Sequence, residues 1–205
     1  MSVYQTEQEK FWAGSFGQDY IARNKSDILL ASNLYLFSQL FSKMQSINTV
    51  LEFGANIGMN LRAIRQLLPK VEISALEINS DAAAQLKSLN CANVYIQSMF
   101  DFILDYQRDF VFTKGVLIHL SPDYLQEAYR VLYESSSKYI CIAEYYNPTP
   151  MKIPYRDHED RLFKRDFCGE MLEKYPDLKF LDYGFCYHRD PHFPQDDITW
   201  FLMEK

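Results

Sequence analysis

The chain has 205 residues, of which 48% are hydrophobic and 16% aromatic, and its formal net charge is −6. This length suits one domain with a sizeable core. The acidic balance argues against a nucleic-acid partner, because phosphate binding needs clustered Lys and Arg, so a small-molecule substrate is expected. The cysteines Cys91, Cys141, Cys168 and Cys186 are far apart and are typical of free thiols in a reducing cytosol.

Residues 1–9 are polar and acidic, where a signal peptide would be basic and then apolar. No apolar run approaches the roughly 20 residues that a membrane span needs. We therefore expect a cytoplasmic protein without membrane contacts. The sequence carries no signature of its oligomeric state.

The first part of the chain has helical patterns. Thr6 and Glu9 form a candidate capping box. Between Asp27 and Met44, apolar residues recur with helical spacing, which predicts a helix packed on a sheet. We expect residues 1–45 to form a helical lid.

From Thr49 onward, short apolar runs alternate with amphipathic stretches, which is typical of β-α-β units in one α/β domain. Pro69 is expected to end the helix after the first strand, and Ser80 with Asp81 to cap the helix after the second. Residues 145–160 are expected to be irregular, and a helix is predicted near 165–175. The predicted strands are 49–53, 71–76, 93–96, 110–112, 139–143, 178–185 and 198–203.

The turn from Leu51 to Gly58 follows the first predicted strand. Ligands of open parallel sheets bind at the carboxyl ends of strands, and glycine lets the backbone approach a ligand closely. A dinucleotide fingerprint would need glycine at positions 56 and 59, where the chain has Asn56 and Met59. A nicotinamide cofactor, and with it a dinucleotide oxidoreductase, is therefore disfavoured.

Two acids accompany this turn. Glu52 precedes Gly54 and could favour a cofactor that carries a positive charge, while Glu77 ends the second strand and could accept both hydroxyls of a ribose. The glycines alone are equally compatible with an ordinary tight turn. Acids at two successive strand ends favour a nucleotide-type cofactor.

These residues resemble the class I S-adenosylmethionine-dependent methyltransferases, and more closely the family described as pseudaminic acid biosynthesis-associated methylases. The resemblance covers nearly the whole chain. It implies a Rossmann-like, doubly wound α/β fold with a seven-stranded sheet whose last strand is antiparallel, and S-adenosyl-L-methionine as cofactor. It rests on residues 7–12, 20–24, 51–58, 114–120, 144–148, 158–161 and 187–191.

The resemblance also assigns parts of the cofactor site. It implies Glu77 at the ribose and Ser98 beside the adenine, where the class often has an aspartate that accepts from the amino group. Arg23 or Asn24 is placed to meet the cofactor carboxylate, although the N-terminal aromatic residues could equally be an amphipathic cover of the sheet. The candidate cofactor-binding residues are Phe11, Trp12, Tyr20, Arg23, Asn24, Glu52, Gly54, Ala55, Asn56, Gly58, Glu77, Ile78, Ser98, Met99, Lys114 and Gly115.

Methyl transfer is an in-line displacement, so the protein mainly aligns and desolvates the reactants. His119 follows the fourth strand and is the candidate base, because histidine titrates near neutral pH; a helix-capping or core histidine is the alternative. Tyr145 and Tyr146 follow the fifth strand and could stack on a sugar or face the sulfonium. A hydrogen-bonded structural pair is the alternative for the tyrosines.

The stretch 145–163 is expected to be a substrate-side loop. Its charged run could bind a carboxylate through Arg156 or Arg161, since a guanidinium pairs with a carboxylate through two hydrogen bonds; a solvated loop is the alternative. His188 and His192 do not predict a metal site, because no third ligand follows from the spacing. The candidate substrate-binding residues are Asn147, Tyr155, Arg156, Arg161, His188 and Arg189.

The leading hypothesis is a methyltransferase that acts on oxygen or nitrogen of a small anionic acceptor. The family resemblance points to nonulosonic sugars of the pseudaminic or legionaminic type, or their precursors. The alternative is an S-adenosylmethionine-binding module or partner subunit without turnover.

Overall fold

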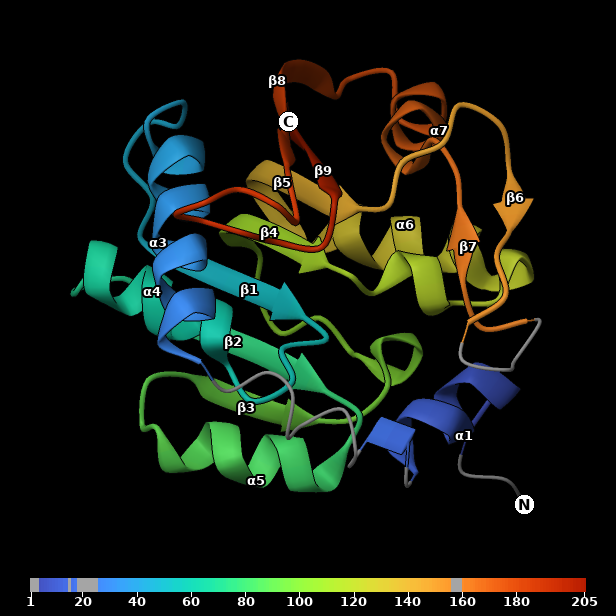
Figure 1. The fold of residues 1–205 in the computed structure, drawn as a ribbon, viewed down its shortest axis with the longest axis horizontal. Coiled ribbons are helices and arrows are strands. Elements are labelled where there is room, and N and C mark those ends of the chain that lie inside the picture. Colours follow the sequence, from blue (N-terminus) through green and yellow to red (C-terminus); the bar gives the residue numbers. More distant parts are fainter. Residues whose placement is uncertain (1–3, 15, 18–25, 156–159) are drawn as a thin grey trace.

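The computed structural model describes residues 4–14, 16–17, 26–155 and 160–205. Its centre is a seven-stranded sheet with the order β3-β2-β1-β4-β5-β9-β8 (Figure 1). The strands from β3 to β5 are parallel, and β9 is antiparallel to both of its neighbours. This confirms the predicted sheet and its antiparallel last strand. The strands are β1 Thr49–Phe53, β2 Glu72–Glu77, β3 Asn93–Ile96, β4 Arg108–Lys114, β5 Ser136–Glu144, β8 Lys179–Cys186 and β9 Ile198–Glu204.

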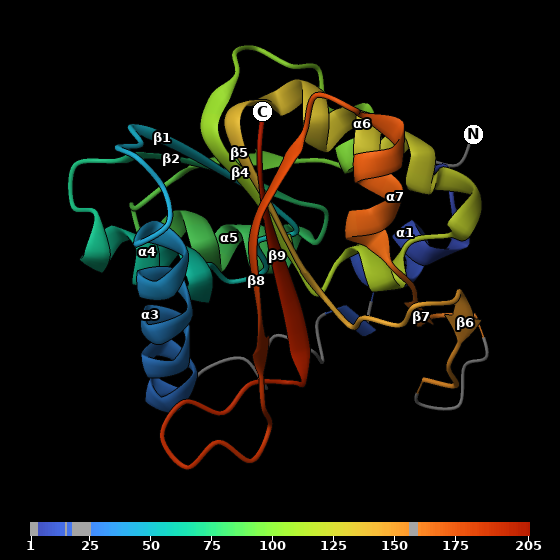
Figure 2. The same ribbon diagram turned by 90° about the horizontal axis from the view of Figure 1, so that it is seen from above.

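Helices cover both faces of the sheet, which makes the fold doubly wound (Figure 2). Because side chains alternate along a strand, successive residues enter different cores. In β4, Phe110 and Phe112 pack under helices α3, α4 and α5, whereas Val111 between them packs under α6 and α7. The helices are α3 Asp27–Phe41, α4 Met59–Leu67, α5 Ser80–Ser88, α6 Leu125–Ser135 and α7 Phe167–Lys174.

Two helix starts test the predicted caps. Helix α1 (Glu7–Ala13) has the predicted capping box, in which the side chains of Thr6 and Glu9 each accept from the backbone N–H of the other. The predicted cap of α5 was wrong by one residue, because Asn79 accepts from the N–H groups of Asp81 and Ala82. Its side chain occupies the N-cap geometry, so Ser80 is already helical.

The stretch after β5 is more regular than predicted. Strand β6 (Met151–Lys152) pairs antiparallel with β7 (Phe163–Lys164) in a separate two-stranded sheet. The expectation that residues 145–160 are irregular was wrong for β6. A strand of two residues is too short to produce an alternating pattern.

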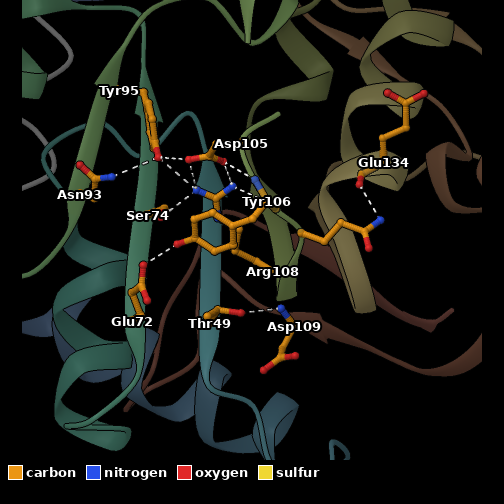
Figure 3. Close-up of polar contacts among 11 residues, drawn as sticks. Thr49, Glu72, Ser74, Asn93, Tyr95, Asp105, Tyr106, Arg108, Asp109 and Glu134 are labelled. Atoms are coloured by element: carbon orange, nitrogen blue, oxygen red, sulfur yellow. Dashed lines mark hydrogen bonds and ion pairs between the residues drawn. The ribbon is translucent and has the colours of Figure 1, made fainter. Parts of the chain in front are cut away.

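A polar cluster around Arg108, whose side chain is fully buried, joins β2 and β3 to the amino end of β4 (Figure 3). Its guanidinium donates to the carboxylate of Asp105, to Ser74 Oγ at 3.2 Å and to Tyr95 Oη at 3.1 Å. The Tyr106 ring lies against it, with 3.7 Å from Arg108 Cζ to the ring centroid. We call these five residues the Arg108 cluster.

Among the helices within the described ranges, none is both long enough and apolar enough to span a membrane.

Candidate cofactor and substrate site

A cavity of about 400 Å³ opens at the carboxyl ends of the parallel strands, opposite the Arg108 cluster. Its size lies within the range of small-molecule pockets. Helix α1 lies beyond the carboxyl ends of β2 and β3 and contributes Gln8, Glu9 and Trp12 to the cavity wall (Figure 1). The cavity is therefore where the fold rule for open α/β sheets expects a ligand.

Most of the described candidates for the cofactor and the chemistry meet in this cavity. They come from α1 and from the segments that follow β1, β2, β3, β4 and β5, which are far apart in the sequence. The predicted residues that line the cavity are Trp12, Gly54, Ala55, Asn56, Glu77, Ile78, Ser98, Met99, Lys114, Gly115, His119, Tyr145 and Tyr155.

The glycine turn is required by the fold as well as by a ligand. Gly54 has φ +75°, and a Cβ there would lie 2.4 Å from Val116 Cγ2. Gly58 has φ +79°, and a Cβ there would lie 2.3 Å from Leu86 Cδ1. A side chain is unfavourable at both positions for conformational and packing reasons. Gly58 lies behind the cavity wall, as the N-cap of α4.

Glu77 lies at the centre of the cofactor side. One carboxylate oxygen accepts from Asn56 N at 2.6 Å and the other from Asn79 N at 2.7 Å. Burial raises the pKa of Glu77, and these backbone N–H groups lower it. Each oxygen keeps a further lone pair, so the carboxylate can accept two hydroxyl groups at once.

A second polar group lies at the ends of β1 and β4. Glu52 is fully buried just behind the cavity wall, and its Oε1 accepts from Asn60 Nδ2 at 2.6 Å. Burial raises the pKa of Glu52 to about 8. Lys114 Nζ donates to Asn33 Oδ1 at 3.3 Å, and burial lowers the pKa of Lys114. Within the described ranges, Glu52 Oε2 and Asn33 Nδ2 are buried without a hydrogen-bond partner.

His119 faces the cavity from the short helix η2 (Leu117–His119) after β4. Its Nδ1 lies 2.6 Å from the carbonyl oxygen of Arg161. Since a carbonyl only accepts, Nδ1 carries the proton and Nε2 is the acceptor nitrogen. Burial lowers the pKa of His119 to about 4, so the ring is neutral at pH 7. Trp12 and Tyr155 flank it, with ring centroids 4.6 and 5.3 Å away.

Glu144, the last residue of β5, fixes the segment that carries His119. Its Oε1 accepts from the N–H groups of Val116 and Leu117, each at 3.0 Å. Burial raises the pKa of Glu144 to about 7, although these N–H groups lower it. Sequence analysis did not assign Glu144 to the site. Its position as a charged residue at the end of a predicted buried strand could have indicated that it belongs to the site.

Eight described candidates lie outside the cavity wall. Phe11 packs behind it, with its ring stacked on Phe16 at 4.2 Å and the Arg161 guanidinium 5.3 Å from the ring. Tyr146 is 41% exposed and contacts Phe201 instead, and Asn147 donates to Thr149. The eight are Phe11, Glu52, Gly58, Tyr146, Asn147, Arg161, His188 and Arg189.

His188 and Arg189 are exposed on the loop between β8 and β9. His188 Nδ1 lies 2.8 Å from the carboxylate of Asp197 on the same loop. Four further candidates, Tyr20, Arg23, Asn24 and Arg156, lie outside the described residues.

Sequence analysis also missed Glu9, Asn33 and Asn60, which line the cavity. Glu9 was explained locally as half of a capping box. Asn33 and Asn60 fall within helical patterns, where an isolated polar residue gives no indication of whether it is buried.

Several solved structures of methyltransferases are similar to this chain. The plantazolicin methyltransferase BpumL in complex with SAH has a TM-score of 0.66 at 12% identity, covering 97% of this chain and 93% of that chain. The magnesium protoporphyrin IX methyltransferase ChlM from Synechocystis PCC 6803 with bound SAH has a TM-score of 0.69 at 10% identity, covering 96% and 97%. The glycopeptide N-methyltransferase MtfA complexed with S-adenosyl-L-methionine has a TM-score of 0.62 at 13% identity, covering 84% and 93%.

No protein-family model matches the sequence, and no curated protein matches it. The likeness at these identities concerns the fold. The chain therefore has the fold of the class I S-adenosylmethionine-dependent methyltransferases. The finer resemblance to the pseudaminic acid-associated methylases stays a prediction from the sequence.

Proposed function

We propose that this protein is an S-adenosyl-L-methionine-dependent methyltransferase that acts on a small acceptor in the carboxyl-end cavity. The observation that carries the proposal is the position of Glu77, whose carboxylate faces the cavity next to the glycine turn of a methyltransferase fold. Structures with this fold hold the cofactor or its demethylated product.

The residues of the cavity suit both halves of this cofactor. Glu77 accepts hydrogen bonds from the ribose hydroxyls, and Ile78 and Met99 provide apolar contacts for the base. At the ends of β1 and β4, Lys114 and Asn33 donate to the carboxylate of the methionine part, and Asn60 faces its amino group while its Nδ2 donates to Glu52 behind the cavity wall. Asn33 lines the cavity, and its Nδ2 has no partner among the described residues, which supports this assignment because a buried polar group without a partner is costly until a ligand pairs with it.

When bound, the cofactor supplies a methyl group on a sulfonium that is already a good leaving group. The protein aligns the acceptor and excludes water. Trp12 and Tyr155 line the cavity beside His119, and Tyr145 also lines it, so the cavity has aromatic side chains that can attract a cation. The neutral His119 offers Nε2 to a hydroxyl or amine of the acceptor.

His119 stays our candidate base. A ring whose pKa is about 4 is unprotonated at neutral pH but is a weak proton acceptor, so its contribution falls at the low end of general-base catalysis. We expect His119→Asn to lower kcat about 100-fold with unchanged affinity for S-adenosylhomocysteine. Steady-state kinetics with calorimetry measure both quantities. Full turnover in the variant removes His119 from the mechanism.

The acceptor class rests on the sequence alone. The proteins with similar structures are named for plantazolicin, a magnesium porphyrin and a glycopeptide, so the fold does not select an acceptor. The nonulosonic sugar acceptor, the lid formed by residues 1–45 and the substrate-side loop formed by residues 145–163 therefore stay predictions.

Titration calorimetry with S-adenosylhomocysteine tests the cofactor, and release of S-adenosylhomocysteine from the cofactor with a panel of acidic sugars tests the reaction. We expect saturable one-site binding and acceptor-dependent release. Absence of binding contradicts the proposal. Binding without turnover on every acceptor favours the alternative of a cofactor-binding module.

A further inference from the structure

Glu9 on α1 has one carboxylate oxygen in use and one without a partner. Its Oε2 accepts from the N–H groups of Thr6 and Gln5, each at 2.7 Å, which completes the capping box. Its Oε1 is buried and has no hydrogen-bond partner among the described residues. The residue is only 5% exposed and lines the cavity. The capping box therefore accounts for Oε2 of Glu9 but not for Oε1.

The contacts of α1 place Glu9 at the end of the cavity formed by residues 97–100. Gln5 Nε2, one turn before Glu9, donates to Asp101 Oδ1 at 3.1 Å, at the end of the short helix η1 (Met99–Asp101). The carbonyl of Trp12, almost one turn after Glu9, accepts from Asn79 Nδ2 at 3.1 Å. The helix thus runs across the region beyond Glu77, where the base of a nucleoside bound through its ribose extends.

An adenine in this region needs an acceptor for its exocyclic amino group. Ser98 is a neutral hydroxyl, and its Oγ already accepts from Phe100 N at 3.1 Å as the cap of η1. The unpartnered Glu9 Oε1 is a stronger acceptor, since hydrogen bonds to a charged oxygen are about twice as strong as neutral ones. A buried oxygen without a partner also favours a ligand that donates to it.

We propose that Glu9 Oε1 accepts a hydrogen bond from the amino group of the cofactor adenine and makes the site selective for adenine over hypoxanthine. This inference rests on the proposed function. Hypoxanthine carries an oxygen in place of the amino group, and that oxygen would face the Glu9 carboxylate with no proton between them. In this proposal, Glu9 on α1 provides the acceptor that an aspartate at the position of Ser98 often provides in the class.

The test compares S-adenosylhomocysteine with S-inosylhomocysteine by titration calorimetry. The wild-type protein is expected to bind the adenosine compound at least about tenfold more tightly, as the loss of one hydrogen bond to a charged group implies. In Glu9→Gln, the amide oxygen can keep the capping box and the amide N–H₂ can donate to the inosine oxygen. We expect the variant to reduce the preference below about threefold or to reverse it.

Two control variants distinguish an effect on base recognition from an effect on the charge or stability of α1. Glu7→Gln removes the same charge from an exposed position of α1, and Thr6→Ala weakens the capping box but keeps Glu9. Both are expected to keep the preference for adenosine. Equal binding of the two compounds to the wild type, or an unchanged preference in Glu9→Gln, overturns the inference and leaves the proposed function standing. Binding of neither compound overturns both.

Discussion

The two ends of the sheet bury polar side chains in different ways. At the amino end, both terminal nitrogens of Arg108 are paired, Tyr106 covers the guanidinium, and only Nε of this side chain has no partner among the described residues (Figure 3). At the carboxyl end, Glu9 and Asn33 line the cavity, and each has a buried polar atom that no group in the described ranges pairs with. A polar network closed by protein groups stabilises the fold, whereas one left open to a cavity is suited to a ligand. Variants at the two ends should therefore separate stability from binding.

The largest effect is expected at the amino end. Arg108→Met removes the cation that pairs with the Asp105 carboxylate and leaves Asp105 with the hydrogen bonds from Tyr95 Oη and Tyr106 N alone. Although burial alone raises it, the Arg108 guanidinium, together with hydrogen bonds from Tyr95 and the Tyr106 backbone, brings the pKa of Asp105 down to about 2. Because Asp105 is partly exposed, we expect a loss of about 3 kcal/mol in the free energy of unfolding, at the low end for breaking a buried pair. For a chain of this size the melting temperature falls by about 6 to 12 °C.

Arg130 provides the matched control for this prediction. It pairs with Glu127 and Glu134 on the surface of α6, where its side chain is 45% exposed. Exposed ion pairs contribute little, so Arg130→Met should change the unfolding free energy by less than about 1 kcal/mol. Chemical denaturation measures both variants. Equal losses would mean that the Arg108 cluster is no more important than a surface pair.

The next effect is expected at the carboxyl end. Glu77→Gln replaces a charged acceptor of two hydroxyl groups with an amide, and we expect about 30-fold weaker binding of S-adenosylhomocysteine. Because an amide has a single acceptor oxygen, one of the N–H groups of Asn56 and Asn79 loses its acceptor, and we expect a loss of about 1 kcal/mol in the free energy of unfolding. Glu72→Gln removes the same charge at the amino end of the same strand. Equal affinities of Glu77→Gln and Glu72→Gln for S-adenosylhomocysteine, measured by calorimetry, would contradict the proposed difference between the two ends of the sheet.

The last effect is a pH dependence of the unfolding free energy caused by Glu52, which is about 1 kcal/mol at each step of one pH unit. Its pKa is about 8 in the folded protein, so the folded state holds a proton that the unfolded chain releases above pH 4.5. The resulting stabilisation is complete below pH 4.5 and is lost as the pH rises toward 8. Glu52→Gln lacks this loss.

Denaturation curves from pH 5 to 8 measure this effect. As the pH rises, the unfolding free energy of Glu52→Gln should increase relative to that of the wild type by about 1 kcal/mol per pH unit. His119 has a lowered pKa and acts in the opposite sense as the pH falls below 6.5, but it is present in both proteins. Parallel curves would mean that Glu52 is ionised in the folded protein throughout this range.

The sequence predicted the sheet well because buried strands produce clear apolar runs. The strands at 49–53 and 93–96 match their predicted bounds. The glycine turn and Glu77 lie at the carboxyl edge of the sheet as predicted, because they follow strands directly and the carboxyl ends of parallel strands meet at one edge. Their role in cofactor binding stays a prediction.

The remaining site residues depend on contacts between distant segments. Glu9 lies at the cavity because α1 contacts the short helix η1 after β3, and its pattern with Thr6 is already explained within its own helix. Glu144 acts through backbone groups that lie 27 and 28 residues earlier in the chain. Neither relation produces a periodicity or a spacing in the sequence. Tyr146 shows the converse, because it follows β5 as predicted but points to the exposed face and packs on Phe201.

A crystal structure with S-adenosylhomocysteine bound tests the central claim most directly. The account predicts the nucleoside in the carboxyl-end cavity, with both ribose hydroxyls on Glu77, the adenine amino group within hydrogen-bond distance of Glu9 Oε1, and the sulfur directed toward His119 and Tyr145. Binding elsewhere, or a ribose away from Glu77, would contradict it.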